Sequence, residues 1–163
     1  MGSDLPSVSI IIPAYNEQET IRACVVAALD QTVAALEIIV VDNMSTDSTA
    51  SIVHALQVTY PDAPIIYLQQ FESQGLIATR NFGLNHASGD VLGRIDADSV
   101  LEPTWVGEVQ RVFSDPSVAA ATGPVIYYDM PLRRFGAIAD DAVRRAVNRV
   151  TREFDLLFGS NMA

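Results

Sequence analysis

The sequence contains no lysine, a single cysteine and no long uninterrupted apolar run. Its 10 basic residues are all arginines and face 20 acidic residues, which gives a formal net charge of -10. The lack of lysine excludes a P-loop lysine and Schiff-base chemistry. An acidic chain also lacks the cationic surface that displaces counterions from nucleic acid, so we expect no nucleic-acid partner.

The few cysteines and the short apolar runs also limit the kind of protein. Cys24 is the only cysteine, which excludes an intrachain disulfide and a cysteine-rich zinc site. No apolar run approaches the roughly 20 residues that span a bilayer, and the N-terminus does not resemble a signal peptide. We therefore expect a cytoplasmic protein, with membrane association only in a longer native chain. Residues 1–163 are long enough for one domain with one core.

Short runs rich in valine and isoleucine alternate with segments of helical periodicity. They predict strands at 8–12, 37–41, 65–69 and 91–95, an irregular strand within 118–128, and a helix between each strand and the next. Asn16 and Glu19 are expected to form a capping box at the start of the helix at 17–29. Pro103 is expected in the first turn of a later helix. The order of elements predicts an α/β fold with a Rossmann-like, mostly parallel sheet and helices on both faces.

Polar residues follow three of these strands, at the edge where open α/β sheets bind ligands. The segments are Pro13 to Glu17, Asp42 to Asp47 and Asp96 to Ser99. Taken singly, Asp42 and Asp47 are explained equally well by turn and cap chemistry. Their occurrence together predicts a binding site at this edge.

Asp96 and Asp98 form the most informative pair. Two carboxylates one residue apart at a strand end repel each other. Mg²⁺ or Mn²⁺ would remove that repulsion, because both ions combine one or two protein carboxylates with substrate phosphates and water. We therefore predict a metal site at Asp98 and Asp96 rather than a solvated acidic turn.

The motifs, in this order, resemble the inverting glycosyltransferases of family 2, which have the GT-A fold. The resemblance covers about Pro6 to Asp115 and rests on VSIIIPAYNE at 8–17, IVVDN at 39–43 with STD at 45–47, ATRNFG at 78–83, ASGD at 87–90 and DAD at 96–98. It implies a nucleotide-diphospho-sugar-binding fold and transfer of a sugar with inversion. The implied donor is UDP- or GDP-linked, and the acceptor is unidentified: a glycan, a lipid or a small molecule.

The resemblance also implies which residues contact the nucleotide-sugar. Asp42 would accept a hydrogen bond from the base, and Asp98 would coordinate the metal with Asp96 nearby. Arg80 would lie beside the nucleotide, although a surface arginine paired with an acid is the alternative. The full set is Pro13, Ala14, Tyr15, Glu17, Asp42, Arg80, Asp96, Ala97 and Asp98.

The carboxylate base that an inverting transferase needs has no clear counterpart. In this family it lies downstream, so we expect it beyond Ala163, with Asp129 as the weaker internal candidate. Residues 6–128 are then the nucleotide-sugar-binding part, residues 129–163 begin the acceptor part, and the fold is incomplete at its C-terminus. An amphipathic helix expected from Phe135 to Phe158 offers an apolar stripe for self-association.

Three other functions compete with sugar transfer. The missing base favours a non-catalytic nucleotide-sugar-binding module or an inactive fragment. A nucleotidyltransferase is disfavoured because Pro13 to Glu17 supplies neither glycine nor a cation. An NAD enzyme is disfavoured because no Gly-x-Gly-x-x-Gly follows the first strand.

Overall fold

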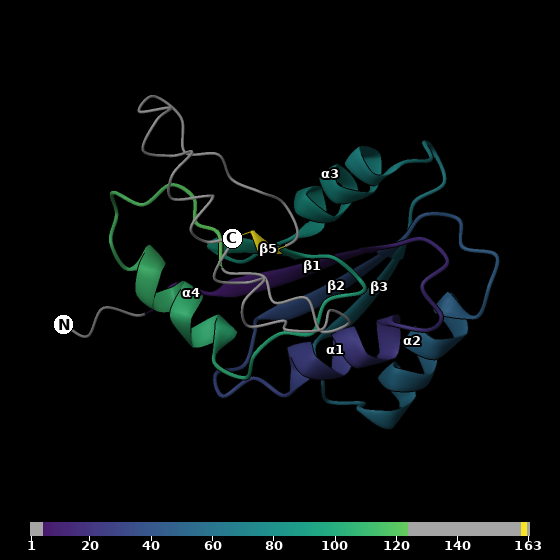
Figure 1. The fold of residues 1–163 in the computed structure, drawn as a ribbon, viewed down its shortest axis with the longest axis horizontal. Coiled ribbons are helices and arrows are strands. Elements are labelled where there is room, and N and C mark those ends of the chain that lie inside the picture. The colour runs from purple at the N-terminus through teal and green to yellow at the C-terminus, as the bar shows by residue number, and fades with distance from the viewer. Residues whose placement is uncertain (1–4, 124–160, 163) are drawn as a thin grey trace, which may run out of the picture.

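Five strands form one sheet in the computed structural model, which describes residues 5–123 and 161–162. The sheet order is β3-β2-β1-β4-β5 (Figure 1). The strands are β1 (Val8–Ala14), β2 (Glu37–Asp42), β3 (Ile65–Gln69), β4 (Val91–Ile95) and β5 (Asn161–Met162). The first four run parallel, whereas β5 pairs antiparallel with β4. The predicted α/β fold with a mostly parallel sheet is therefore confirmed.

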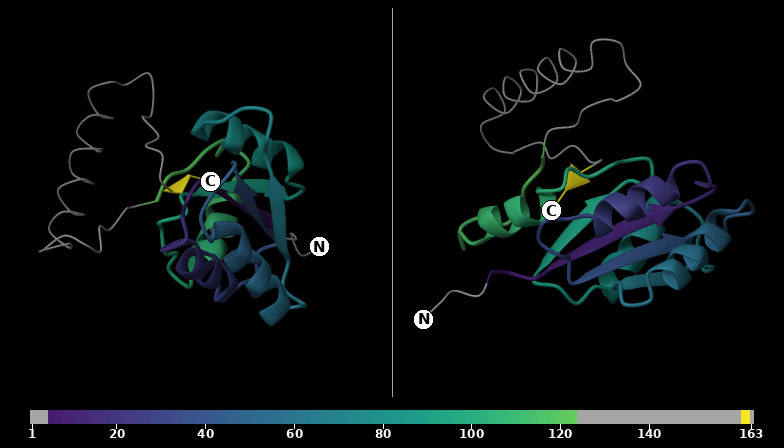
Figure 2. Two further views of the ribbon diagram at one scale, coloured as in Figure 1. Left: turned by 90° about the vertical axis from the view of Figure 1, so that its right-hand side faces the viewer. Right: turned by 90° about the horizontal axis from the view of Figure 1, so that it is seen from below.

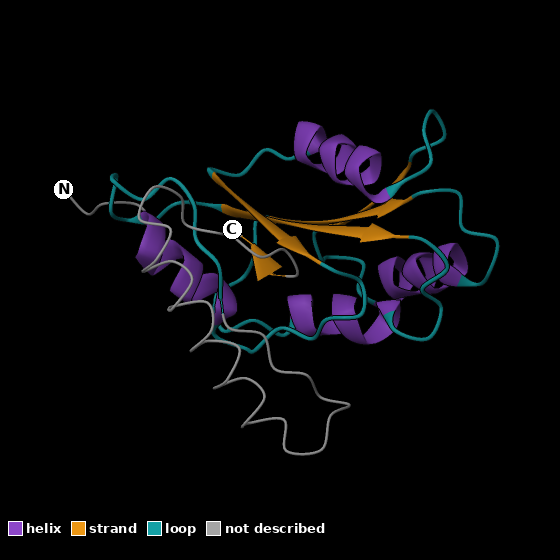
Figure 3. Ribbon diagram, turned by 45° about the horizontal axis from the view of Figure 1, so that its top comes forward, coloured by secondary structure: helices purple, strands orange, loops and turns teal. Residues whose placement is uncertain are grey.

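Helices cover both faces of the sheet, as the views in Figure 2 and Figure 3 show. Three of them lie on one face: α1 (Ile21–Leu29), α2 (Thr49–Thr59) and α4 (Trp105–Phe113). The fourth described helix, α3 (Leu76–His86), lies on the other. Successive residues of a strand face opposite sides, so the central strands are buried throughout their length. Two-sided burial explains why β1 and β2 read as nearly continuous apolar runs.

Glycines let two helices approach the sheet closely. A Cβ atom at Gly83 of α3 would lie 2.5 Å from Ile11 Cγ2 and 2.9 Å from Val41 Cγ2. A Cβ atom at Gly93 of β4 would overlap the ring of Trp105, the first residue of α4. At both positions a side chain would overlap its neighbours, so glycine is explained by the packing of helix against sheet.

A hydrogen-bond network joins β1, β2 and the loop before β4 at the edge of the sheet where the parallel strands begin. The buried Glu37 accepts hydrogen bonds at Oε1 from Ser9 Oγ at 2.6 Å and from Ser88 N and Oγ at 2.7 and 2.9 Å. Burial on its own raises the pKa of Glu37, but these hydrogen bonds outweigh it and bring the pKa below its ordinary value. Asp90 Oδ2 likewise accepts from Ser7 N and Oγ. The ASGD segment at 87–90 is therefore explained by the fold.

The predicted capping box at Asn16 and Glu19 is wrong, because α1 begins at Ile21. Asn16 has φ 56°, which differs from the extended backbone of a usual N-cap residue. Its side chain accepts instead from the N–H of Thr46 at 2.8 Å. Residues 18–20 form a turn in which Glu17 C=O accepts from the N–H groups of Thr20 and Ile21.

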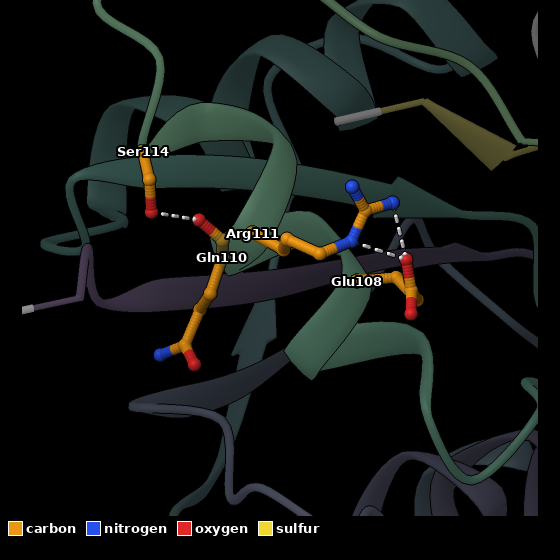
Figure 4. Close-up of polar contacts among 4 residues, drawn as sticks. All are labelled: Glu108, Gln110, Arg111 and Ser114. Carbon is orange, nitrogen blue, oxygen red and sulfur yellow. Dashed lines mark hydrogen bonds and ion pairs between the residues drawn. The ribbon is translucent and has the colours of Figure 1, made fainter.

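Helix α4 also starts later than predicted, two residues after Pro103. Near its end, Arg111 Nε and Nη2 donate to Glu108 Oε2, and Ser114 Oγ donates to the Gln110 carbonyl at 2.7 Å (Figure 4). The Gln110 side chain donates to Pro6 C=O at 2.9 Å and ties α4 to the start of β1.

Several predictions fall partly or wholly outside the described residues. Of the strand expected within 118–128, the structure describes only residues as far as Gly123, where Thr122 forms an isolated bridge. Asp129 and the helix expected from Phe135 to Phe158 lie outside the described residues. Among the helices that the structure does describe, none has the length and apolar character needed to cross a bilayer.

Candidate functional site

Three loops leave the same edge of the sheet, where β1, β2 and β4 end. Ala14 closes β1 and pairs with Asp42, which closes β2. Asn43 N donates to Ala14 C=O at 2.9 Å. On the other side of β1, β4 ends at Ile95, immediately before Asp96. The parallel sheet therefore brings together the three polar segments that the sequence singled out.

Crossed hydrogen bonds join the loop after β1 to the loop after β2. In each, a side chain of one segment binds a backbone N–H of the other. The donor–acceptor pairs are Asn16 N to Ser45 Oγ (2.9 Å), Thr46 N to Asn16 Oδ1 (2.8 Å), Glu17 N to Thr49 Oγ1 (2.8 Å), Gln18 N to Asp47 Oδ2 (3.1 Å) and Ser48 N to Gln18 Oε1 (3.1 Å). These bonds hold the two loops in one arrangement before any ligand arrives.

Each of the two joined loops contains a residue with a left-handed backbone. Asn16 has φ 56° and Met44 has φ 64°. Non-glycine residues in this region are uncommon and gather at functional sites, where the surrounding structure holds them. Here the two hydrogen bonds that join Asn16 to Ser45 and Thr46 stabilise the left-handed backbone of both loops.

Asp42 lies at the base of these loops and is buried, with 2% of its surface exposed. Its Oδ1 accepts from Ser45 N at 2.9 Å, and its Oδ2 accepts from the hydroxyl of Tyr67 at 2.6 Å. Burial, followed by the bond to Asp42 and its charge, raises the pKa of Tyr67 above its ordinary value. The Tyr67 hydroxyl is therefore held as a donor, and Asp42 has one fixed orientation.

The Asp96-Ala97-Asp98 segment points its middle residue inward and its carboxylates outward. Ala97 is 3% exposed and belongs to the main core, the apolar cluster between the sheet and the helices α1, α2 and α4. Asp96 is partly exposed and Asp98 is exposed. Cys24 of α1 donates from its thiol to Asp96 C=O at 3.6 Å. Burial, and then the charges of Asp98, Asp96 and Glu17, raise the pKa of the Cys24 thiol to about 12. The charges of all three carboxylates therefore act on the thiol of α1.

Two arginines lie on the α3 side of the same edge. Arg80 of α3 donates from Nη2 to Asp96 Oδ1 at 2.9 Å. Arg94 of β4 is partly buried, and burial followed by the charge of Arg80 lowers its pKa. This pair agrees with the alternative explanation of Arg80 as an arginine paired with a nearby acid. The pair also places the guanidinium beside the predicted metal site.

The other predicted contacts have different degrees of exposure. Pro13 and Ala14 are buried as the last residues of β1, whereas Tyr15 is 49% exposed. Glu17 is partly exposed, and its Oε2 accepts from Thr20 Oγ1 at 2.8 Å. Only part of this group is therefore presented to a ligand in the structure as it stands.

The donor set fits a divalent cation that is shared with a ligand. Asp98 and Asp96 present carboxylate oxygens, which Mg²⁺ and Mn²⁺ prefer. The described residues contain no cluster of three or more His, Cys, Asp or Glu side chains that could hold a metal ion. A cation at this edge therefore needs oxygen ligands from a bound molecule, as in sites where a metal bridges protein carboxylates and phosphates.

Sequence reasoning missed two residues that organise the site. Tyr67 lies within β3, and its hydroxyl reaches Asp42 at the end of β2. Asn43 is 2% exposed and holds the loop between β3 and α3 through hydrogen bonds with Gln70, Ser73 and Gly75. The sequence could not indicate these contacts, because the partners lie far apart along the chain. A tyrosine inside an apolar strand and an asparagine in a turn are both common without such a role.

The sequence matches the family model of glycosyl transferase family 2 over residues 9–159. This chain belongs to glycosyltransferase family 2. It is 36% identical to the glycosyltransferase AglE of Haloferax volcanii over 127 residues, which cover 77% of this chain and 41% of AglE. It is also 36% identical to the chondroitin synthase of Pasteurella multocida over 102 residues, 63% of this chain and 10% of that protein.

Solved structures of transferases share the fold of this family 2 chain. The mannosyltransferase PcManGT from Pyrobaculum calidifontis, in complex with GDP-Man and Mn²⁺, superposes with a TM-score of 0.71 at 30% identity. The match covers 77% of this chain and 37% of PcManGT. A glucosyl-3-phosphoglycerate synthase from Mycobacterium tuberculosis, bound to UDP, has a TM-score of 0.65 at 20% identity, covering 97% of this chain and 56% of that one. These neighbours confirm the GT-A fold.

Proposed function

We propose that this chain is the donor-binding part of an inverting glycosyltransferase and holds a UDP- or GDP-linked sugar at the edge where β1, β2 and β4 end. The observation that carries the proposal is the convergence of Asp42 and the Asp96–Asp98 pair at that edge. One acceptor group for a base and two carboxylates for a metal–diphosphate match the two ends of a nucleoside diphosphate. The GDP-Man and Mn²⁺ bound by PcManGT support this choice of ligand.

We assign each predicted contact to a part of the donor. Pro13, Ala14 and Tyr15 line the end of β1 and Asp42 the end of β2, so we assign the base to the space beside them. Glu17 and Asp96 then face the ribose. Because the crossed hydrogen bonds hold these loops in place, little ordering is needed when the nucleotide binds.

Asp98, together with Asp96, would hold Mn²⁺ or Mg²⁺ against the diphosphate. When bound, such an ion stabilises the negative charge that develops on the leaving nucleotide. Arg80 holds Asp96 by its ion pair at 2.9 Å and adds positive charge beside the phosphates. Ala97 anchors the segment in the core, which fixes the positions of both carboxylates.

Transfer with inversion requires a carboxylate that removes the proton of the acceptor hydroxyl. Our internal candidate for this base, Asp129, lies outside the described residues. The chain spans 41% of AglE and 37% of PcManGT. Donor binding without transfer is the second candidate function, because no described residue is assigned as the base.

Calorimetric titration with UDP and GDP, with and without Mn²⁺, tests the proposal directly. We expect binding to require the metal and to be lost in Asp98→Asn, which removes the charge but keeps the shape. Asp62→Asn, at an exposed aspartate outside the edge, is the matched control. Tight binding without metal, or unchanged binding by Asp98→Asn, would refute the role of Asp98. Release of nucleotide from a UDP- or GDP-sugar on addition of acceptor separates transfer from binding alone.

A further inference from the structure

The hydroxyl of Tyr67 makes a hydrogen bond to the predicted base-binding residue. Tyr67 is half-buried on β3, and its hydroxyl donates to Asp42 Oδ2 at 2.6 Å. The other oxygen, Oδ1, accepts from Ser45 N at 2.9 Å. A carboxylate that already faces a donor at each oxygen can offer a further ligand only acceptor lone pairs.

The Tyr67 ring is itself held by two contacts. It packs against the main core and makes an edge-on contact with the His54 ring of α2, with a centroid distance of 4.6 Å. These contacts hold the ring in place, and with it the hydroxyl that donates to Asp42.

Asp42 depends on these two donors because it is almost completely buried. Losing one donor there costs more than it would at an exposed carboxylate, because hydrogen bonds in such surroundings are strong. Removing the Tyr67 hydroxyl would leave Oδ2 without its donor and allow the carboxylate to turn about its terminal bond. The acceptor lone pairs would then no longer have a fixed direction.

We propose that Tyr67 is a positioning residue: it fixes the orientation of Asp42 and thereby helps to select the nucleobase. A fixed acceptor at Asp42 favours a base with a ring N–H, as in uracil and guanine. It disfavours cytosine and adenine, which present a ring-nitrogen acceptor at the corresponding edge. The inference rests on the proposed function and adds the residue that makes the base preference strict.

Tyr67→Phe tests the inference because it deletes the hydroxyl and keeps the ring against His54. Tyr60→Phe, at the exposed end of α2, is the matched control. Each protein is titrated with UDP, CDP, GDP, ADP and inorganic pyrophosphate in the presence of Mn²⁺. We expect Tyr67→Phe to bind the preferred nucleotide about tenfold more weakly, the size of one hydrogen bond to a charged group. The ratio of UDP to CDP affinity, or of GDP to ADP affinity, should fall by a similar factor.

Pyrophosphate separates positioning from a general structural effect. It has no base, so its affinity should be the same in the wild type, Tyr67→Phe and Tyr60→Phe. An equal loss of pyrophosphate and nucleotide affinity, or an unchanged base preference in Tyr67→Phe, would overturn the inference while leaving the proposed function intact. A wild-type chain that binds pyrophosphate but shows no preference among the four nucleotides would also overturn it. A wild-type chain that binds neither UDP nor GDP would overturn the proposed function and this inference together.

Discussion

The guanidinium of Arg80 and the carboxylate of Asp96 form an ion pair of 2.9 Å that links α3 to the end of β4. The two side chains are 21% and 30% exposed. Arg80 Nε is buried and has no hydrogen-bond partner among the described residues. The pair turns one Asp96 oxygen toward α3, so under the proposed function we expect Asp98 to be the main metal ligand. A ligand phosphate at this edge would meet Arg80 without a large movement of α3.

Arg80→Ala should reduce nucleotide binding more than it reduces stability. A partly exposed ion pair contributes about 0–1 kcal/mol to folding, whereas a hydrogen bond from a guanidinium to phosphate contributes about 1.5–3 kcal/mol. Calorimetry with UDP or GDP and Mn²⁺ should therefore show a loss of about tenfold or more. Arg111→Ala, which breaks the exposed pair with Glu108, is the control. Full nucleotide affinity in Arg80→Ala would show that Arg80 only pairs with Asp96.

Gly83→Ala should destabilise the fold even though alanine is the better helix former. The new methyl group would lie 2.5 Å from Ile11 Cγ2 and 2.9 Å from Val41 Cγ2, both on buried strands. Overpacking of this kind costs about 1–3 kcal/mol. Gly107→Ala is the control, because its methyl group would meet only Val33 Cγ2 at 3.6 Å. Urea denaturation should show a loss of stability for Gly83→Ala and a gain of up to about 1 kcal/mol for Gly107→Ala. The opposite order would contradict the described packing of α3.

The central strands β1 and β2 could be predicted from sequence because two-sided burial leaves a continuous apolar run, although they end at Ala14 and Asp42, one or two residues later than predicted. Residues 65–69 and 91–95, which form β3 and β4, were predicted with the observed bounds. The start of α1 could not be predicted, because Asn16 and Glu19 satisfy the local capping pattern. The side chain of Asn16 binds Thr46 instead, across a gap of 30 residues that the local pattern does not include.

The same limit applies to the candidate site. The sequence indicated Asp42, Asp96 and Asp98 because each follows a recognisable strand, and the sheet brings the ends of those strands together. The hydrogen-bond partners of Asp42 and Asp96 could not be predicted in this way. Tyr67 and Arg80 reach them from β3 and α3, and only the register of the sheet and the seating of α3 decide which side chains meet.

Glu37→Gln should change the pH dependence of stability. The folded pKa of Glu37 lies below its ordinary value of 4.5, so the unfolded chain takes up the proton first as the pH falls. The ionised carboxylate then makes its full contribution to the free energy of unfolding above about pH 4.5, and this contribution is lost as the pH falls through the folded pKa. We expect Glu37→Gln to be about 1–2 kcal/mol less stable at pH 7, because it weakens charge-assisted hydrogen bonds from Ser9 and Ser88.

Denaturation from pH 7 to pH 3 measures this difference. The stabilities of the wild type and Glu37→Gln should converge at the acidic end. Glu72→Gln, at an exposed carboxylate in the β3–α3 loop, should follow the wild type throughout. A difference for Glu37→Gln that stays constant with pH would mean that its cost comes from packing rather than from charge.

Asn43→Asp should be harmful although it changes only one atom. The buried Asn43 Nδ2 donates to Gln70 O at 3.1 Å, Gln70 Oε1 at 2.9 Å and Ser73 O at 3.1 Å, while Oδ1 accepts from Gly75 N at 2.7 Å. An aspartate keeps the acceptor for Gly75 but turns a second oxygen toward three other oxygens. Asn43→Ala removes both functions without adding repulsion.

We therefore expect both Asn43 variants to lose about 1–3 kcal/mol of stability, with Asn43→Asp the less stable of the two at pH 7. Hydrogen exchange should become faster at the amide of Ser73 in both variants, because its acceptor Gln70 Oε1 is held by Asn43, and at the amide of Gly75 in Asn43→Ala, which removes its acceptor. Asn85→Ala, at an exposed position of α3, is the control and should leave both measurements unchanged. Equal stability of Asn43→Asp and the wild type would show that the Nδ2 hydrogen bonds do not hold the loop. Loosening confined to residues 70–75, with nucleotide binding retained, would show that the loop can move without disturbing the Arg80–Asp96 pair behind it.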